Sequence, residues 1–549
     1  MSPQSPRVTV VVIGYDDAAH IADAVRSALA QGPAVHEVIA VDDCSTDATP
    51  AVLHSLADAD PRVRVLRRAA NSGGCGTPRN DGADAATGEY LMFLDSDDVL
   101  APGAVDALLR AALRHGAQVA SGLCVRREVP SGRELPWQPE LYRKPALVAR
   151  PERRPRLVHD TLCVNKLYRT DFLREHGVRF PEGRFVYEDF VFGARVLAAA
   201  PRIALIPDTV YVWHVRRAAS RLSISLDRSG IDNWKARVEA HRQAVEILRD
   251  ADGGPDGGPG GGSGGKALAR AARAKFLDHS LRMYARELPA RDPEYRRAWW
   301  TLTRAYLAGF DAADLAAAPA PGRVIARVLL ASPRPRDLDR LRQVAARPAR
   351  LTPPYALDGD GTPVWSADLP QVTLEHLLDR PLRLLPLAVD AELRPREGTL
   401  RLRLHELYGR VAAAGPAVVD VELVHRESGR PGQRRTAAFA AETPGETWTA
   451  EVRLDLAALD GDVYDLRLRL LFDDGTARAA TARAVAGPGL LRRGAVPAGR
   501  RGLVLVQPYA TQAGSLAVRL APGARGVAEV ARRRLARAAA RLRPGPRRH

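Results

Sequence analysis

Apolar and polar positions over residues 8–120 follow two periodicities in turn. Short apolar runs typical of buried strands alternate with stretches in which apolar residues recur at helical spacing. The runs predict strands at 8–15, 36–43, 62–68 and 89–95, and the helical spacing predicts helices at 21–32, 52–56, 80–88 and 102–115. This alternation predicts an α/β domain with a βαβ sheet. Asp or Gly lies at the ends of the strands at 8–15, 36–43 and 89–95, at the sheet edge where open α/β sheets bind their ligands.

Both periodicities fade after residue 120. Residues 121–160 contain Pro, Trp and many Arg, and we expect an irregular active-site loop there. Strand and helix patterns resume over 161–225, and a helix is predicted over 232–250. The next stretch, 251–265, reads ADGGPDGGPGGGSGG. Such a composition lacks the apolar side chains of a core and predicts a flexible linker.

The second half of the chain changes from helical to strand-like patterning. Residues 266–345 predict an all-helical segment, with the adjacent tryptophans 299 and 300 in its core. Period-two alternation after residue 380 predicts an antiparallel β-sandwich over about 352–488. An Ala/Arg-rich helix is predicted from 525 onward. The expected organisation is an α/β catalytic domain at 1–230, a helical segment at 231–350, the sandwich domain at 351–490 and a basic tail at 491–549.

The formal net charge of +17 is concentrated at the C-terminus. Residues 492–549 contain 14 Arg and one acidic residue, so their net charge is 14 − 1 = +13, which leaves 17 − 13 = +4 for residues 1–491. We therefore expect the tail, rather than the body, to be the part that meets an anionic surface. Only five of the 81 basic residues are Lys, and such an Arg bias also accounts for scattered arginines without any binding role.

Composition excludes several classes of protein. A hydrophobic content of 46% excludes a chain that is disordered throughout, and no apolar run approaches the ~20 residues that span a bilayer. The N-terminal MSPQSPR lacks the features of a signal peptide, so a cytoplasmic location is expected. The four cysteines are too far apart for a zinc motif, and free thiols are expected at Cys44, Cys75, Cys124 and Cys163.

The motif LDSDD at 94–98 follows directly on an apolar run. Carboxylates one residue apart at a strand end, here Asp95 and Asp97, can bind a hard divalent cation that neutralises a diphosphate. An isolated Asp-x-Asp is more commonly a solvated turn. The motif therefore needs support from its neighbours.

Two further segments supply that support. VDDCSTD at 41–47 ends the second predicted strand, where a carboxylate can accept from a base or a ribose. NSGGCGTPRND at 71–81 provides glycines for close backbone approach and Arg79 for a phosphate or base. Each carboxylate could separately be a helix cap, Asp47 above all. Their order along one sheet edge favours a shared binding site.

These segments together resemble the family 2 glycosyltransferases with the GT-A fold. The resemblance is carried by VVVIGYDDAAHI, VDDCSTDAT and NSGGCGTPRNDGADAATGEYLMFLDSDD, and NKLYRTDFLREHGVRFPEGRFVYEDFVF extends it to about residue 225. It implies a Rossmann-like mixed sheet. The departures from the family pattern are Ile13 for Pro, Asp16 for Asn, Cys44 for Gly and Pro78 for Ala.

The resemblance implies a role for each matching residue. Donor-nucleotide binding falls to Gly14, Tyr15, Asp43, Arg79 and Asp95, and the ligands of a divalent cation, Mn²⁺ or Mg²⁺, to Asp95, Asp97 and His214. Asp189 corresponds to the general base, and Glu188 orients it or binds hydroxyls of a substrate. An acceptor hydroxyl has a pKa far above neutrality, so inverting transfer needs such a carboxylate opposite the leaving nucleotide. A Glu-Asp pair at the start of a helix could also simply interact favourably with the helix dipole.

Two further groups of residues have an open role. Arg216, Arg217 and Ser220 follow His214 and could close over the diphosphate, while Lys166 could face the acceptor; His214 itself could equally be an ordinary hydrogen-bonding histidine. A basic stretch at 126–156 suits a phosphate-rich acceptor or simply reflects the Arg bias. Its basic residues are Arg126, Arg127, Arg133, Arg143, Lys144, Arg150, Arg153, Arg154 and Arg156.

The leading hypothesis is a metal-dependent, inverting transfer of a sugar from a nucleotide-diphosphate donor to a cell-envelope polymer. The domain order is similar to that of bacterial wall teichoic acid glycosyltransferases, in which the sandwich promotes oligomerisation. One alternative is a lipid-linked acceptor, with the Arg tail anchoring the enzyme to the inner face of the plasma membrane. Another is a non-catalytic polyanion binder. Nucleic acid is not expected, since the tail lacks interleaved aromatics. The nucleotide and sugar stay open.

Overall fold

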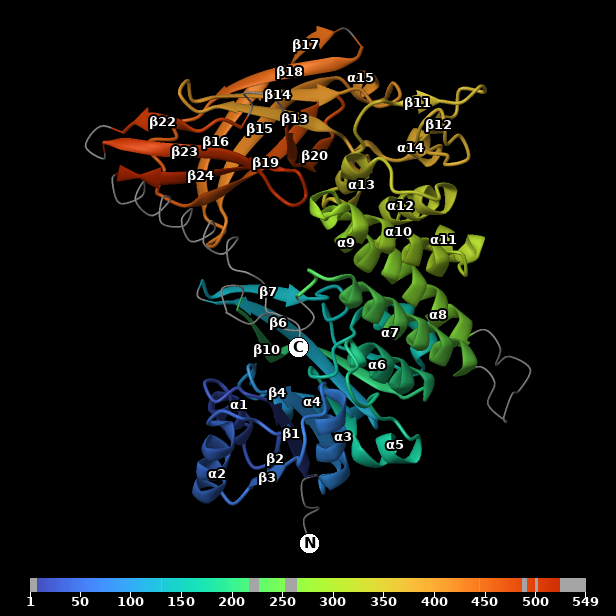
Figure 1. Cartoon of the computed structure of the whole chain (residues 1–549), viewed down its shortest axis with the longest axis vertical. Coiled ribbons are helices and arrows are strands. Elements are labelled where there is room, and N and C mark those ends of the chain that lie inside the picture. The colour runs from blue at the N-terminus through green and yellow to red at the C-terminus, as the bar shows by residue number, and fades with distance from the viewer. Residues whose placement is uncertain are drawn as a thin grey trace. The chain divides into compact units, whose positions relative to one another are not determined.

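The computed structural model describes residues 7–129, 131–216, 227–251, 264–443, 445–485, 491–498 and 502–523 (Figure 1). The chain forms two compact units. Unit 1 comprises Met1–Phe276 with Ala308–Ala318, and unit 2 comprises Leu277–Leu307 with Pro319–His549. No helix in the described ranges combines the length and the apolar character needed to cross a bilayer.

Unit 1 is built on a mixed sheet, as the sequence predicts. In its described part the strand order is β3-β2-β1-β4-β9-β6-β10-β5, with β7 beside β6 and β8 beside β10. Strands β1, β2, β3 and β4 are mutually parallel, and β9 runs antiparallel between β4 and β6. The bounds are β1 Val8–Gly14, β2 Val35–Asp42, β3 Val63–Arg67, β4 Tyr90–Asp95, β5 Val99–Leu100, β6 Val119–Glu128, β7 Arg133–Trp137, β8 Ala146–Val148, β9 Lys166–Arg169 and β10 Ile203–Val215.

The central strands form because they are continuously apolar. All seven residues of β1 are buried, which is the pattern of a strand covered on both faces. Helices cover the sheet, and α4 ends at Gly116, whose φ of 53° provides a left-handed C-cap. The helices of unit 1 are α1 Ile21–Leu29, α2 Thr49–Ala59, α3 Gly76–Ala85, α4 Ala104–His115, α5 Thr170–Glu175, α6 Glu188–Ala198, α7 Ile231–Asp250, α8 Gly264–Lys275 and α11 Ala312–Ala317, with 3-10 turns at Pro151–Arg153 and Pro155–His159.

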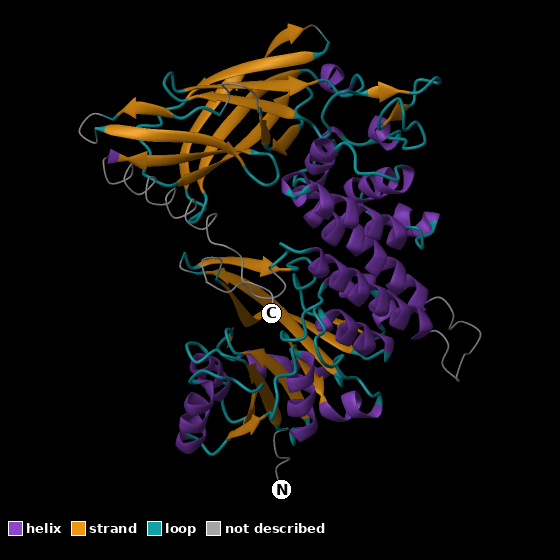
Figure 2. Ribbon diagram, in the orientation of Figure 1, coloured by secondary structure: helices purple, strands orange, loops and turns teal. Residues whose placement is uncertain are grey.

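In its described part, unit 2 combines helices with three β-sheets (Figure 2). Trp299 and Trp300 are 1% and 0% exposed, so they are core residues as expected. The helices are α9 Arg282–Glu287, α10 Pro293–Leu307, α12 Ala320–Ala331, α13 Leu338–Ala345, α14 His376–Asp379 and α15 Arg410–Ala414, with shorter turns at Phe276–Leu281, Leu288–Ala290 and Leu382–Leu384. A small two-stranded sheet pairs β11 Ala356–Leu357 with β12 Pro363–Val364.

The two larger sheets of unit 2 are mainly antiparallel, which confirms the prediction of antiparallel strands in the second half of the chain. Their strand orders are β17-β18-β14-β13-β21 and β16-β15-β19-β24-β23-β22, with β20 beside β19, and only the pairing of β13 with β21 is parallel among the described strands. The bounds are β13 Val389–Arg394, β14 Thr399–His405, β15 Pro416–His425, β16 Pro431–Ala438, β17 Ala440–Thr443, β18 Thr447–Arg453, β19 Val463–Phe472, β20 Ala477–Ala480, β21 Ala482–Ala484, β22 Gly494–Pro497, β23 Leu503–Ala510 and β24 Leu516–Pro522.

Two expectations need correction. Residues 121–160 are not irregular throughout, because 119–128 and 133–137 pair as β6 and β7. The basic tail does not begin at 491, since β22, β23 and β24 occupy much of 494–522 and bury an alternating apolar row that includes Val504, Val506 and Leu520. The many arginines of residues 492–549 obscure the period-two alternation of apolar residues within 494–522. The linker over 252–263 and the expected tail helix from 525 lie outside the described residues.

Candidate active site

The predicted donor residues gather where β1, β2 and β4 end. Gly14 ends β1, and a Cβ added to it would lie 2.5 Å from Cδ1 of Ile21, so glycine lets α1 pack closely against this strand end. Tyr15 follows it and is 38% exposed. The backbone N–H of Asp43, at the end of β2, donates to the carbonyl oxygen of Gly14 at 3.0 Å. The segments that contain Gly14 and Asp43 are therefore direct neighbours.

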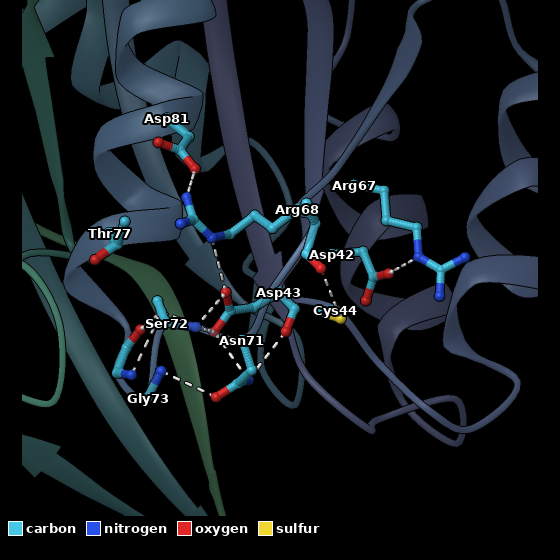
Figure 3. A network of polar contacts seen from close by, with 12 residues as sticks. Asp42, Asp43, Cys44, Arg67, Arg68, Asn71, Ser72, Gly73, Thr77 and Asp81 are labelled. Carbon is cyan, nitrogen blue, oxygen red and sulfur yellow. Dashed lines mark hydrogen bonds and ion pairs between the residues drawn. The ribbon is translucent and has the colours of Figure 1, made fainter.

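Asp43 organises the loop that follows β3 (Figure 3). Its carboxylate accepts from the Ser72 backbone N–H at 3.1 Å, from the Ser72 hydroxyl at 2.8 Å and from the Asn71 amide at 3.1 Å. Nε of Arg68 lies 3.0 Å from its Oδ1. Burial raises the pKa of Asp43 above its usual value despite these donors. The structure thus shows a loop-holding role for Asp43, and nucleoside recognition by it stays a prediction.

The departure at Cys44 has a backbone explanation. Cys44 adopts a φ of 63°, in the left-handed region that favours glycine, and glycine is the usual residue of the family pattern here. Its thiol donates to the carbonyl oxygen of Ala69 at 3.7 Å. The four cysteines are free thiols, as expected. The β2 loop therefore keeps its turn although the glycine is replaced.

Arg79 joins three carboxylates in the interior of unit 1. It lies on α3, and its side chain is 3% exposed. Its Nη2 donates to Oδ1 of Asp95 at 2.6 Å, and its Nη1 donates to Oε1 of Glu188 at 2.6 Å and to Oδ1 of Asp189 at 3.4 Å. One guanidinium therefore connects the end of β4 with the start of α6. The structure brings the two halves of the predicted site together through a residue that the resemblance placed beside Asp43.

The Glu188–Asp189 pair is electrostatically unusual. Burial, and after it the charge of Asp189, raises the pKa of Glu188 to about 7 although Arg79 opposes the shift. Burial also raises the pKa of Asp189, and the negative charge of Asp95 adds to the effect. Both carboxylates remain within hydrogen-bonding distance of Arg79. At neutral pH the pair is thus poised to take up a proton, which is what a general base requires.

The raised pKa values predict the pH dependence of the reaction. A base must be deprotonated to act, and burial raises the pKa of Asp189, so we expect kcat/KM to rise with pH through a midpoint above that of an ordinary aspartate. An unperturbed carboxylate would instead place this midpoint near about pH 4. The measurement is a profile of kcat/KM from about pH 5 to about pH 9, with donor binding followed in parallel. A profile that is flat over this range would contradict the assignment.

Asp97 lies beyond β4 and meets the end of β10. Its backbone carbonyl accepts from Nη1 of Arg216 at 2.9 Å and lies 3.2 Å from Nδ1 of His214. Nη1 of Arg216 is also 3.3 Å from a carboxylate oxygen of Asp97. Partial burial, together with the charges of Asp95 and Asp17, raises the pKa of Asp97 to about 6. The structure therefore brings His214 and Arg216 to the acidic turn, whereas Arg217 and Ser220 lie outside the described residues.

The last Asp of LDSDD supports this turn and was not predicted to have a role. Asp98 is 4% exposed, accepts from the Tyr211 hydroxyl at 2.8 Å and from the His214 backbone N–H at 2.7 Å. The Tyr211 oxygen in turn accepts from the backbone N–H of Asp95 at 3.3 Å. Asp98 thereby fixes β10 against the acidic turn. Asp98 directly follows the predicted metal ligands in the sequence, and this position was the available signal for a role at the turn. Its burial then requires hydrogen-bond partners, which Tyr211 and His214 provide.

The ammonium group of Lys166 forms hydrogen bonds to other residues of the protein. Its ammonium donates to Oδ2 of Asp160 at 2.8 Å, to the carbonyl of Leu162 and to Oδ1 of Asn165 at 2.9 Å. These bonds use its three donors. Direct contact of Lys166 with an acceptor therefore stays a prediction without support from its hydrogen bonds.

Several arginines of the basic stretch 126–156 form ion pairs. Arg127 pairs with Glu134 at 2.5 Å, Arg143 with Glu140 at 2.9 Å and Arg150 with Glu152 at 2.6 Å. Arg126 lies beside two indole rings that contact each other, with its guanidinium carbon 5.7 Å from the ring of Trp137 and 5.9 Å from that of Trp213. These contacts are local, and they weaken the view that the whole stretch is dedicated to phosphate binding.

No cluster of three or more His, Cys, Asp or Glu side chains with metal-binding geometry occurs in the described part of the chain. Asp95 and Asp97 supply two carboxylates at the acidic turn. This number fits Mg²⁺ or Mn²⁺ in a phosphate-transfer type of site, where one or two protein carboxylates act together with substrate phosphates and water. The donor set is thus compatible with a cation that arrives with its diphosphate.

The sequence matches the model of "Glycosyl transferase family 2" over residues 9–177. It is 35% identical to the succinoglycan biosynthesis protein ExoO of Rhizobium meliloti over 253 residues, which cover 44% of this chain and 70% of ExoO. It is 28% identical to the poly(ribitol-phosphate) beta-N-acetylglucosaminyltransferase TarS of Staphylococcus aureus over 219 residues, which cover 40% of this chain and 37% of TarS.

Solved structures of S. aureus TarS share the fold. The crystal structure of TarS superposes with a TM-score of 0.53 at 18% identity and covers 94% of this chain and 85% of TarS. Residues 1–349 of TarS in complex with UDP-GlcNAc superpose with a TM-score of 0.50 at 22% identity, covering 65% of this chain and 96% of that fragment. These likenesses confirm the GT-A fold. Together with the match to most of ExoO, they lead to one conclusion: this chain belongs to glycosyl transferase family 2 and is a glycosyltransferase.

Proposed function

We propose that the enzyme transfers a sugar, with inversion and with a divalent cation, from a nucleotide-diphosphate donor to a hydroxyl of a cell-envelope polymer. The observation that carries this proposal is the Arg79 bridge, which connects Asp95 on the donor side to Asp189 on the side of the base. TarS acts on poly(ribitol-phosphate) by its name, and ExoO serves succinoglycan biosynthesis. Both names support a polymer of the cell envelope as acceptor.

Asp189 is the proposed general base. It accepts the proton of the acceptor hydroxyl while that oxygen attacks the anomeric carbon opposite the departing nucleotide, which inverts the configuration. Glu188 shares the Arg79 guanidinium with it and thereby fixes its orientation. Because burial raises the pKa of Asp189, the carboxylate is a better proton acceptor than an exposed aspartate.

Asp95 and Asp97 would hold the cation, and a bound Mn²⁺ or Mg²⁺ would neutralise charge that develops on the leaving diphosphate. Arg216 and His214 lie against Asp97 and are placed to contact the same diphosphate. The complex of the TarS fragment with UDP-GlcNAc supports a UDP-sugar as the donor class to test first. The tail over 525–549 would add attraction to an anionic acceptor or membrane.

A panel of nucleotide sugars tests the proposal directly. We expect release of nucleoside diphosphate with one donor in the presence of Mn²⁺ or Mg²⁺, loss of at least about 100-fold in rate after chelation, and recovery on adding the metal back. Asp97→Asn should raise the metal concentration needed for half-maximal activity, because it removes one carboxylate ligand, while the chain stays folded by circular dichroism. Turnover that is unaffected by chelation would contradict metal dependence, and no turnover with any donor would contradict the donor assignment.

A further inference from the structure

Two cationic side chains of unit 1, the buried Arg237 and the partly buried Lys275, have no role in the proposed chemistry. Arg237 lies on α7, where it is 7% exposed, and Lys275 ends α8. Helix α7 packs against both α6 and α8 (Figure 1). Both side chains lie near the aromatic ring of Phe190. The Arg237 guanidinium carbon is 5.4 Å and Nζ of Lys275 is 5.7 Å from the ring centre. They thus mark one location beside the start of α6.

The hydrogen bonds of these cations are incomplete. Within the described ranges, Nε and Nη1 of Arg237 are buried and meet no hydrogen-bond acceptor. Nζ of Lys275 donates to the carbonyl oxygen of Val158 at 3.1 Å. A guanidinium presents five N–H donors and an ammonium three, and a guanidinium stays charged at all physiological pH values. A buried charge without an anion is costly, so this arrangement suits an anion that comes from outside.

Among the described residues, few negative charges lie near these cations. Asp160 is the carboxylate whose charge acts on Lys275. Its oxygens already accept from the Trp137 indole at 3.0 Å, from the Tyr142 hydroxyl, and from Lys166 at 2.8 Å. Lys166 alone balances the single charge of Asp160. Burial lowers the pKa of Lys275 to about 7, so this side chain is only partly charged at neutral pH, and the excess positive charge belongs mainly to Arg237.

Arg237 contacts the residue that directly precedes the Glu188–Asp189 pair. The Arg237 guanidinium carbon is 4.4 Å from the ring centre of Tyr187, which directly precedes Glu188 and Asp189. Tyr187 has a φ of 69° and donates its hydroxyl to Oδ1 of Asn233 on α7 at 2.8 Å. A bulky residue in the left-handed region is held there by such contacts. An anion bound to Arg237 would therefore lie beside the residue that precedes the proposed base.

We propose that Arg237 and Lys275 form a subsite for a phosphate group of the acceptor. The subsite rests on the proposed function, since the acceptor is the substrate that meets Asp189. An Arg fork together with a Lys point charge is a common combination for phosphate. The donor diphosphate is assigned to the acidic turn of Asp97 and Arg216, so it does not compete for this location. The subsite would select phosphate-bearing polymers over neutral ones.

Inorganic phosphate is the probe for the subsite itself. Isothermal titration calorimetry on the full chain, at constant ionic strength with chloride as the reference, should show phosphate binding that weakens by at least about 10-fold in Arg237→Met and in Lys275→Met. Replacing a buried charge by an apolar side chain of similar size often preserves stability, so these variants should fold. The matched control is Arg242→Met on the same helix, where Arg242 pairs with Glu239 and Glu246 at the surface.

Kinetics then separate this proposal from the proposed function. In Arg237→Met we expect KM for a phosphate-bearing polymer to rise by at least about 10-fold, with KM for the donor and hydrolysis of the donor without acceptor unchanged. KM for a neutral polysaccharide should not change. Absence of phosphate binding by the wild type, or equal binding by wild type and both variants, would overturn the subsite. Absence of donor turnover by the wild type would instead overturn the proposed function, while phosphate binding could still be measured.

Discussion

Asp189→Asn should abolish sugar transfer while leaving the fold intact. The amide has nearly the shape of the carboxylate, but it cannot take a proton from the acceptor hydroxyl. General-base catalysis contributes about 10²- to 10⁴-fold, so kcat should fall by about this factor with the KM of the donor unchanged. Single-turnover kinetics at saturating donor would measure the loss. Circular dichroism and donor titration would show that folding and donor binding persist.

Asp232→Asn is the matched control for this variant. Asp232 also lies in the first turn of a helix, α7, but its side chain is 89% exposed and pairs only with Lys235 among the described contacts. Its kcat should equal that of the wild type. If Asp189→Asn kept more than about a tenth of the wild-type kcat, another group would have to serve as the base. If Glu188→Gln lost as much as Asp189→Asn, the two carboxylates would act as one unit.

The sequence predicted the strand ends of the site well, because local patterning determines them. The run YLMFLD must be a buried strand, and Asp95 then has to lie at its carboxyl end, beside the end of the strand that contains Gly14. The mutual proximity of the acidic segments follows from the parallel order of β1, β2 and β4. The sheet edge was therefore predictable from one-dimensional patterns.

The partner of Arg79 was not predictable in this way. Arg79 and Asp189 are 110 positions apart, and no periodicity relates α3 to the first turn of α6. An arginine in a motif that resembles a nucleotide site suggests a phosphate ligand, whereas the buried guanidinium in fact joins carboxylates of two elements. The same limit applies to Arg237 and Lys275, whose shared surroundings depend on helix packing. Ion pairs between distant residues and the packing of helices determine these contacts, and neither leaves a local signal in the sequence.

Arg79→Met should destabilise the chain by about 3–5 kcal/mol, the range for removing one partner of a buried ion pair. Asp95, Glu188 and Asp189 would lose their common cation. The pKa values of Glu188 and Asp189, which burial already raises, should then rise further. The folded variant then holds protons that the unfolded chain releases, and its stability is lost as pH rises through these pKa values. Urea denaturation should therefore show a larger loss at about pH 8 than at about pH 5.5.

Arg179→Met provides the contrast, because it removes an arginine whose side chain is 45% exposed and pairs with Asp84 at 2.6 Å. A surface pair of this kind contributes about 0–1 kcal/mol, and its loss should depend little on pH between these values. Arg79→Lys should recover part of the stability but little of the activity, since an ammonium cannot present two forked N–H groups to Asp95 and to the Glu188–Asp189 pair at once. Equal and pH-independent losses in Arg79→Met and Arg179→Met would show that Arg79 is not the cation that holds the base against the donor site.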